Sequence, residues 1–288
     1  MNDLWKHKET INISVFGPAD HGKSTLVGYL FSQYRKEDFN KYIQKVQKKL
    51  VQDYQKDRMY AYVSDRHTQE QVGFIDQDET GRQFKGTTQH VHGLAIPIIE
   101  DTLFHFIDNP GHHRWQKETI MGISRGDYGI FVMAIKELHE KLDLFKSLLK
   151  EDKLISFPEE IRQYIVPLYI ALKLGLKLCC VVFSKMDAIK YNESIYKECE
   201  KVIKEFLTKH FDVPEDKTVI VPTSIIATTE VSENVINKTD KIPWYSDSPL
   251  IKKIVSLYEL PREENYPFFL PVQKSYFKIP GHKLIVTG

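Results

Sequence analysis

The stretch GPADHGKST, from Gly17 to Thr25, constrains the fold of this chain more than any other feature. It follows the apolar run INISVF (11–16) and opens into STLVGYLF (24–31), so a strand leads through a glycine-rich loop into a helix. In the pattern Gly-x-x-x-x-Gly-Lys-Ser, backbone N–H groups of such a loop cradle phosphates. The stretch therefore predicts a P-loop fold that binds a nucleotide, without choosing between ATP and GTP.

The residue types of this loop have distinct predicted tasks. Lys23 is expected to reach the β- and γ-phosphates, and the Ser24 hydroxyl to bind Mg²⁺. The helix that begins here directs its positive end at the anion. The predicted nucleotide-binding residues of the loop are Gly17, Asp20, His21, Gly22, Lys23, Ser24 and Thr25.

Apolar runs and helix-like segments alternate along the rest of the chain. Strand candidates lie at 93–99, 103–108, 128–135, 178–184 and 218–224, and helix-like segments lie near 114–125, 137–150, 159–174 and 190–210. This alternation is typical of an α/β protein with a mostly parallel sheet covered by helices on both faces. We predict that fold class.

The motif DNPGH, from Asp108 to His112, follows the apolar run 103–108. An Asp at the end of a buried strand can hold Mg²⁺ through water, and Gly111 can offer its N–H to a γ-phosphate without a side chain in the way. An isolated Asp-x-Pro-Gly is often only a turn. Its position after a phosphate loop and a strand favours the functional interpretation.

The motif SKMD (184–187) follows another apolar run and indicates the base. The Asp187 carboxylate can accept hydrogen bonds from N1–H and the exocyclic amine of guanine, and adenine has neither donor in that position. Lys185 can lie along the ring. The PTS segment (222–224) can lend a backbone N–H near Ser224 to the guanine O6, although this signal alone is weak.

Composition places few further limits on function. The 288 residues carry a formal net charge of +1, so bulk electrostatics gives no reason to expect nucleic-acid binding. Cys179, Cys180 and Cys199 include no CxxC pair and indicate reduced thiols in a core. The N-terminus has no apolar segment like that of a signal peptide, and Lys173 and Lys177 interrupt the longest apolar stretch. We expect a soluble, cytoplasmic protein that does not bind membranes.

Two segments depart from the α/β pattern. Between residues 33 and 62, eight Lys or Arg stand against four Asp or Glu, and Phe39, Ile43 and Val46 recur at helical spacing. A solvated amphipathic helix explains this charge surplus, and an RNA-contacting patch is the alternative. From Pro261 onward, strand-like runs separated by Pro and Gly replace helices. We predict a nucleotide-binding domain over 1–260 and the first strands of an incomplete β-barrel domain over 261–288.

The ordered set GPADHGKST, KGTT, DNPGH, SKMD and PTS resembles the translational GTPases, and within them the elongation factor 1-alpha/Tu family. YAYVSD (60–65), ENVINKTDKIPWY (233–245) and LPVQKSYFKIPGHKLIVTG (270–288) resemble segments of its archaeal and eukaryotic members. The last of these resembles the start of the family's second domain, a β-barrel. The resemblance covers nearly the whole chain.

The resemblance implies roles for individual residues. It implies GTP or GDP with Mg²⁺ as the cofactor and a metal site at Ser24, Thr88 and Asp108. Gly111 matches the glycine that contacts the γ-phosphate, and His112 matches the histidine that positions the attacking water. Ser184, Lys185, Asp187 and Ser224 would form the guanine site.

The resemblance also implies a biological role. It implies a GTPase whose nucleotide state controls delivery of aminoacyl-tRNA or a tRNA-like protein factor to the ribosome, with an exchange factor as a further partner. A release or ribosome-rescue GTPase of the same family is the nearest alternative. A GTP-binding regulatory scaffold with little hydrolysis and a GTPase subunit of a metabolic enzyme, as in sulfate activation, are others.

Several positions differ from the family's pattern. Ser184 stands in place of Asn, so we expect a lost contact to the loop or the base and weakened nucleotide affinity. In the family, two bulky apolar residues screen the histidine matched by His112 from the attacking water. Ala19 and Thr87 stand at these positions, which predicts looser control of GTP hydrolysis. An insertion near 67–82 lies in the switch region, the mobile segment that follows the stretch matched by YAYVSD in this family. His90 and His92 are expected to pack rather than to bind metal, and His113 to lie at the surface.

Overall fold

A six-stranded sheet organises the larger part of the molecule in the computed structural model, which describes residues 9–49, 55–64, 92–99, 102–112, 115–151, 156–257, 274–277 and 284–287. The strand order is β2-β3-β1-β4-β5-β6. The strands are β1 (Glu9–Phe16), β2 (His92–Ile99), β3 (Thr102–Asp108), β4 (Tyr128–Ala134), β5 (Lys177–Ser184) and β6 (Ile220–Pro222). Only β2 runs antiparallel to its neighbour, so the predicted mostly parallel sheet is confirmed.

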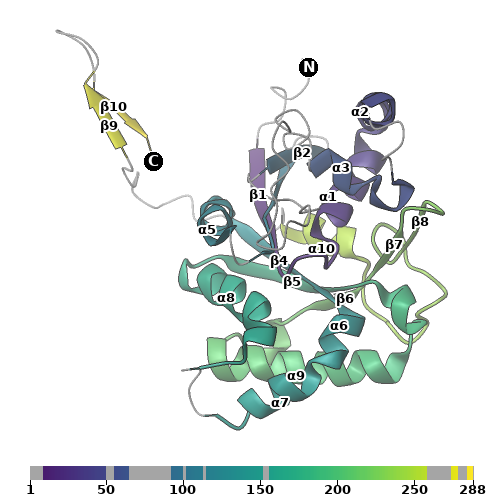
Figure 1. Cartoon of the computed structure of the whole chain (residues 1–288), viewed down its shortest axis with the longest axis vertical. Coiled ribbons are helices and arrows are strands. Elements are labelled where there is room, and N and C mark those ends of the chain that lie inside the picture. Colours follow the sequence, from purple (N-terminus) through teal and green to yellow (C-terminus); the bar gives the residue numbers. More distant parts are fainter. Residues whose placement is uncertain are drawn as a thin grey trace, which may run out of the picture. The chain divides into compact units, whose positions relative to one another are not determined.

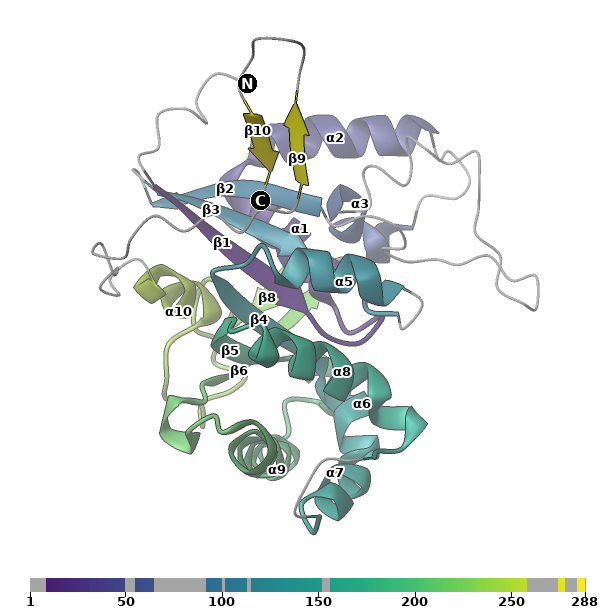
Figure 2. The same cartoon turned by 90° about the vertical axis from the view of Figure 1, so that its left-hand side faces the viewer.

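Helices cover both faces of this sheet (Figures 1 and 2). One face packs against α1 (Lys23–Tyr34), α2 (Lys36–Lys49), α3 (Ala61–Ser64) and α10 (Leu250–Ser256). The opposite face packs against α5 (Gln116–Ile123), α6 (Ile135–Glu140), α7 (Leu142–Leu148), α8 (Glu159–Lys173) and α9 (Glu193–Phe211). The predicted two-sided α/β architecture is therefore confirmed.

The alternation of side chains along β1 explains why both faces are buried. Ile13 and Val15 enter the core under α1, whereas Phe16 stacks on Phe131 in the opposite core, with ring centroids 5.3 Å apart. Strands buried on both faces read as continuous apolar runs, which is the pattern seen in the sequence.

Shorter elements complete the larger unit. In the part of the chain that the structure describes, 3-10 turns lie at Lys56–Arg58, Met186–Ile189 and Glu215–Lys217. A small antiparallel pair, β7 (Ser224–Ile226) and β8 (Val231–Glu233), follows β6. The helix expected over 137–150 is divided into α6 and α7 at Lys141, and the strand expected over 218–224 is interrupted at Thr223.

The amphipathic helix predicted between residues 33 and 62 is confirmed over α2. In α2, Phe39, Ile43 and Val46 are buried in the core, while Lys41 and Lys45 are exposed. The arrangement agrees with an amphipathic helix. The same helical spacing continues in the sequence to Leu50 and Tyr54, which lie outside the described residues.

The chain divides into two compact units, residues 1–258 and residues 259–288. In the second unit, β9 (Lys274–Phe277) and β10 (Leu284–Thr287) form an antiparallel pair. Among the described residues, no helix is both long and apolar enough to cross a membrane.

Candidate nucleotide-binding site

Three of the predicted motifs, the phosphate loop, DNPGH and SKMD, begin at the carboxyl edge of the parallel sheet. The phosphate loop follows β1, Asp108 ends β3, and Ser184 ends β5. The register places Asp108 beside Val15 and Ser184 beside Ala134, the last residue of β4. Ligands of open α/β sheets bind at this edge, so the topology brings residues far apart in sequence to one place.

Lys23 lies buried beneath the phosphate loop. Its ammonium donates to the carbonyl of Pro18 at 2.6 Å, and the side chain is 5% exposed. Burial lowers the pKa of Lys23 to about 8, and the carboxylates of Asp108 and Asp20 partly offset that effect. A cation held in this manner is positioned to meet a phosphate that replaces the lost solvation.

The loop after β3 packs directly on the phosphate loop. Asn109 fixes its start, because its side-chain amide donates to Ser14 Oγ at 2.8 Å and to the Val15 carbonyl at 2.9 Å. At Gly111, a Cβ atom would lie 2.5 Å from both the Ala19 nitrogen and Lys23 Nζ. Only glycine fits this close approach of the two loops. The contact of Gly111 with a γ-phosphate stays a prediction.

Asp108 and Ser24 carry the oxygen donors that Mg²⁺ prefers. Asp108 is 1% exposed, and its negative charge acts on the nearby Lys23 ammonium. A buried carboxylate beside a loop of phosphate-binding pattern suits a divalent cation, so these residues fit a magnesium site. Thr88, the third predicted ligand, lies outside the described residues.

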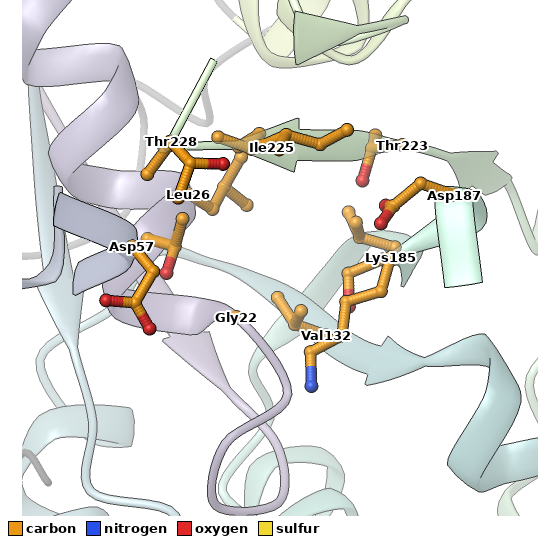
Figure 3. Close-up of a pocket in the computed structure, with 14 residues that line it drawn as sticks. Gly22, Leu26, Asp57, Val132, Lys185, Asp187, Thr223, Ile225 and Thr228 are labelled. Atoms are coloured by element: carbon orange, nitrogen blue, oxygen red, sulfur yellow. The ribbon is translucent and has the colours of Figure 1, made fainter. Parts of the chain in front are cut away.

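A cavity of about 260 Å³ joins the phosphate loop to the predicted base-reading residues. Gly22 and Thr25 line one part of it, and Ser184, Lys185 and Asp187 line another. Figure 3 shows Asp187 and Lys185 facing this cavity from one side. Its remaining walls are largely apolar and include Leu26, Val132, Val182, Ile225 and Ile226.

Asp187 is oriented by a serine from the neighbouring segment. The Ser224 hydroxyl donates a short hydrogen bond to Asp187 Oδ1, and Ser224 itself is buried. The backbone N–H of Met186 donates to the Thr223 carbonyl at 3.1 Å, which holds the two segments together. A carboxylate accepts several hydrogen bonds, so Asp187 retains the capacity to receive guanine donors.

Two further contacts anchor the SKMD segment. Ser184 Oγ donates to the carbonyl of His21 at 2.6 Å, so the short side chain does contact the phosphate loop. Lys185 forms an ion pair with Glu137 at 3.1 Å. Its backbone adopts the left-handed conformation, with φ of 56°. The ion pair and the backbone turn fix the direction in which the Lys185 side chain leaves β5.

His21 lies in the loop but its ring faces the protein. Its Nδ1 accepts the backbone N–H of Ala134 at 2.7 Å, and Nε2 lies 3.4 Å from the Tyr164 hydroxyl. Burial lowers the pKa of His21 to about 2, and the positive charges of Lys23, Lys185 and Lys141 act in the same direction. The imidazole is therefore neutral.

His112 lines a different, smaller hollow. Its neighbours there include Gln116 and Thr119 of α5 and Arg162 of α8. The structure therefore does not bring His112 into the cavity lined by Asp187. Thr87, His90, His113 and the insertion near 67–82 lie outside the described residues, as does the side chain of His92.

Asp57 is a pocket residue that the sequence motifs did not indicate. It belongs to the 3-10 turn Lys56–Arg58 and lines the same cavity as Asp187, on the opposite side in Figure 3. No local pattern marks it, because its turn is placed by contacts with segments distant in sequence, such as the Lys56–Glu230 ion pair at 3.2 Å. Asn109 was likewise missed as the anchor of its loop, although it lies within a quoted motif.

The cysteines and histidines add no second metal centre within the described ranges. Cys179, Cys180 and Cys199 are free thiols, as the sequence predicted. No group of three or more His, Cys, Asp and Glu side chains is arranged to hold an ion in the parts of the chain that the structure describes.

A mostly parallel sheet, a glycine-rich phosphate loop and a cavity at its carboxyl edge are the features of a P-loop nucleotide-binding protein. The sequence model of the family described as "Elongation factor Tu GTP binding domain" matches residues 8–260. The chain belongs to this family of translational GTPases.

The curated relatives are distant in sequence, but the similarity extends over nearly the whole chain. Elongation factor 1-alpha of Pyrobaculum calidifontis is 28% identical over 98% of this chain, and that of Plasmodium falciparum is 28% identical over 99%. This chain covers 56% and 57% of those two proteins, so it spans about half the length of the relatives it matches.

Solved structures share the fold. The GTP-bound Ski7 GTPase-like domain of S. cerevisiae has a TM-score of 0.58 at 17% identity, covering 98% of this chain and 59% of that chain. Sup35 complexed with GDP has a TM-score of 0.52 at 21% identity, covering 96% of this chain and 52% of that chain. At these identities the likeness concerns the fold.

Proposed function

We propose that this protein binds GTP and GDP with Mg²⁺, hydrolyses GTP, and uses its nucleotide state to control a complex with a translation partner. The partner we favour is the ribosome together with aminoacyl-tRNA or a tRNA-like protein factor, with an exchange factor to renew GTP. Membership of a translational GTPase family supports this assignment. A cytoplasmic location follows from the same role.

The observation that carries the proposal is the continuity of one cavity from the phosphate loop to Asp187. In this arrangement Lys23 and the loop N–H groups would hold the phosphates, while Asp187 would read guanine. Asp57, across the cavity, would accept a hydrogen bond from a ribose hydroxyl. Ser224 supports the guanine reading because it already orients the Asp187 carboxylate.

GTP hydrolysis requires little covalent chemistry from the protein itself. Lys23 would neutralise charge on the γ-phosphate, Gly111 would donate its N–H to it, and His112 would orient the attacking water. Because His112 lines a hollow against α8, its loop would have to turn before it could act. Bound Mg²⁺ would be held by Ser24, Thr88 and Asp108 and would supply charge neutralisation.

The domain assignment belongs to the same proposal. We assign residues 1–260 to a GTP-binding domain and residues 261–288 to the beginning of a β-barrel. The antiparallel pair of β9 and β10 is of the kind that begins such a barrel. The division of the chain into units near residue 258 also supports this assignment.

Calorimetric titration of the full chain with GDP, GTP and ATP tests the nucleotide assignment. We expect binding of GDP and GTP but not ATP. Asp187→Asn should move the preference from guanine toward xanthine, because the amide matches the extra carbonyl of xanthine. Asp216→Asn, an exposed residue of the turn Glu215–Lys217, is the matched control. Equal affinity for ATP and GTP would refute the base assignment.

A regulatory scaffold with little hydrolysis is the second candidate. The position of His112 outside the nucleotide cavity favours it. Multiple-turnover GTP hydrolysis with and without ribosomes separates the two candidates. Tight GTP binding without ribosome-stimulated turnover would support the scaffold.

A further inference from the structure

His21 connects the phosphate loop to three separate elements. Its imidazole Nδ1 accepts the N–H of Ala134, where β4 ends and α6 begins, at 2.7 Å. Because Nδ1 accepts, the ring proton of the neutral imidazole lies on Nε2, which faces the Tyr164 hydroxyl of α8 at 3.4 Å. The His21 and Tyr164 rings also meet edge to face, with centroids 5.1 Å apart.

The backbone of His21 makes the third connection. Its carbonyl accepts the hydroxyl of Ser184, the last residue of β5, at 2.6 Å. Ser184 directly precedes Lys185 and lies three positions before Asp187. One residue of the phosphate loop is therefore bonded to the segment that would read the base.

These contacts leave no polar atom of the His21 ring for a nucleotide. Both ring nitrogens face protein groups, and the residue is 4% exposed. The loop motif alone suggested a nucleotide-binding histidine. The geometry suggests instead that His21 acts through the loop backbone, whose N–H groups would bind the phosphates.

We propose that His21 is a positioning residue, which fixes the phosphate loop against the ends of β4 and β5 and thereby sets how long a guanine nucleotide stays bound. The inference rests on the proposed nucleotide binding. A loop released from these anchors would retain its N–H groups but would lose their common direction. The cost should appear as faster dissociation more than as slower association.

The test measures release of a fluorescent GDP analogue from the full chain by stopped flow. His21→Asn keeps an acceptor near the position of Nδ1, whereas His21→Leu keeps bulk but leaves the buried Ala134 N–H without its acceptor. We expect His21→Leu to release the nucleotide at least about tenfold faster than wild type, and His21→Asn to stay within about threefold. Ser184→Ala should accelerate release to an intermediate extent.

Tyr196→Phe is the matched control for general destabilisation. It removes a buried hydrogen bond of 3.0 Å to the Ile220 carbonyl, between α9 and β6, and leaves the three hydrogen-bond contacts of His21 in place. It should lower the melting temperature without changing release. Equal acceleration in Tyr196→Phe and His21→Leu, or identical release by His21→Leu and wild type, would overturn the proposal.

A spectroscopic measurement covers the case in which His21→Leu does not fold. Nitrogen-15 NMR of wild-type protein at pH 7 should show His21 as the Nε2–H tautomer, unchanged when GDP is added. A change of tautomer on GDP addition would overturn the positioning role. If wild type bound no GDP, the proposed function would fail, while the tautomer would still test the anchoring geometry.

Discussion

Replacing Gly28 with Ala sets helix propensity directly against packing. Gly28 lies inside α1, where alanine is favoured over glycine by about 0.8–1.0 kcal/mol. A Cβ atom at this position would lie 1.9 Å from the carbonyl oxygen of Tyr60 and 2.6 Å from its carbonyl carbon. These are backbone atoms, which cannot rotate aside as a side chain could.

We expect packing to outweigh propensity. Overpacking of a core typically costs about 1–3 kcal/mol, and a contact this close to fixed backbone belongs at the upper end of that range. After the propensity gain, a net loss of about 2 kcal/mol of unfolding free energy remains. Asp57 is three residues before Tyr60 and lines the nucleotide cavity, so GDP affinity should fall as well.

Thermal unfolding and GDP titration of Gly28→Ala measure both effects. A domain of this size changes its melting temperature by about 2–4 °C for each kcal/mol, so a decrease of about 4–8 °C is expected. Asn40→Ala, at an exposed position of α2, tests propensity without the contact and should be neutral or slightly stabilising. A higher melting temperature for Gly28→Ala would show that the approach of α1 to Tyr60 is not as close as described.

Three further outcomes test the site. Asp57→Ala should weaken GDP binding by about 0.5–1.5 kcal/mol but leave 2′,3′-dideoxy-GDP binding unchanged, since the lost bond is to a ribose hydroxyl; equal weakening for both nucleotides would contradict this. His112→Ala should reduce ribosome-stimulated GTP hydrolysis by about 100-fold or more. GDP affinity should be retained, because His112 does not line the proposed nucleotide cavity. An unchanged stimulated rate would exclude His112 as the residue that orients water. Burial lowers the pKa of His21 to about 2, so the folded protein keeps this imidazole neutral where the unfolded chain protonates it. The unfolding free energy should therefore be highest above pH 6.5 and fall between pH 6.5 and 2, by up to about 1.4 kcal/mol per pH unit. Urea unfolding between pH 5 and 7.5 should give a shallower pH slope for His21→Asn than for wild type, and identical slopes would show that His21 is not buried as a neutral ring.

The sheet could be predicted from sequence because its strands have a recognisable local pattern of apolar residues. β4 and β5 are largely buried on both faces, so each appears as an apolar run, and β5 ends where the SKMD motif begins. The carboxyl ends of parallel strands share one edge, which places Asp108 and Ser184 near the loop after β1. Fold class and motif placement therefore follow from local pattern and one topological rule.

The remaining features depend on contacts between residues far apart in sequence. His21 is bonded to Ala134, 113 residues away, and no local pattern indicates that its ring turns from the phosphate side. Asp57 lines the cavity because its turn packs on segments distant in sequence, one of which it reaches through the Lys56–Glu230 ion pair. The division of α6 from α7 at Lys141 was also missed, since apolar residues on both sides keep a helical period across the break.

Ser184 shows what a departure from a motif changes physically. Its shorter side chain was expected to lose a contact to the loop or to the base, but its hydroxyl donates to the His21 carbonyl at 2.6 Å. A hydroxyl has one proton to donate, whereas the amide of Asn has two. The loop contact is retained, so we expect any hydrogen bond lost relative to Asn to be one toward the nucleotide or its surroundings. A neutral hydrogen bond contributes about 0.5–1.5 kcal/mol, which limits the loss of nucleotide affinity to about 2- to 12-fold and leaves the pocket able to bind.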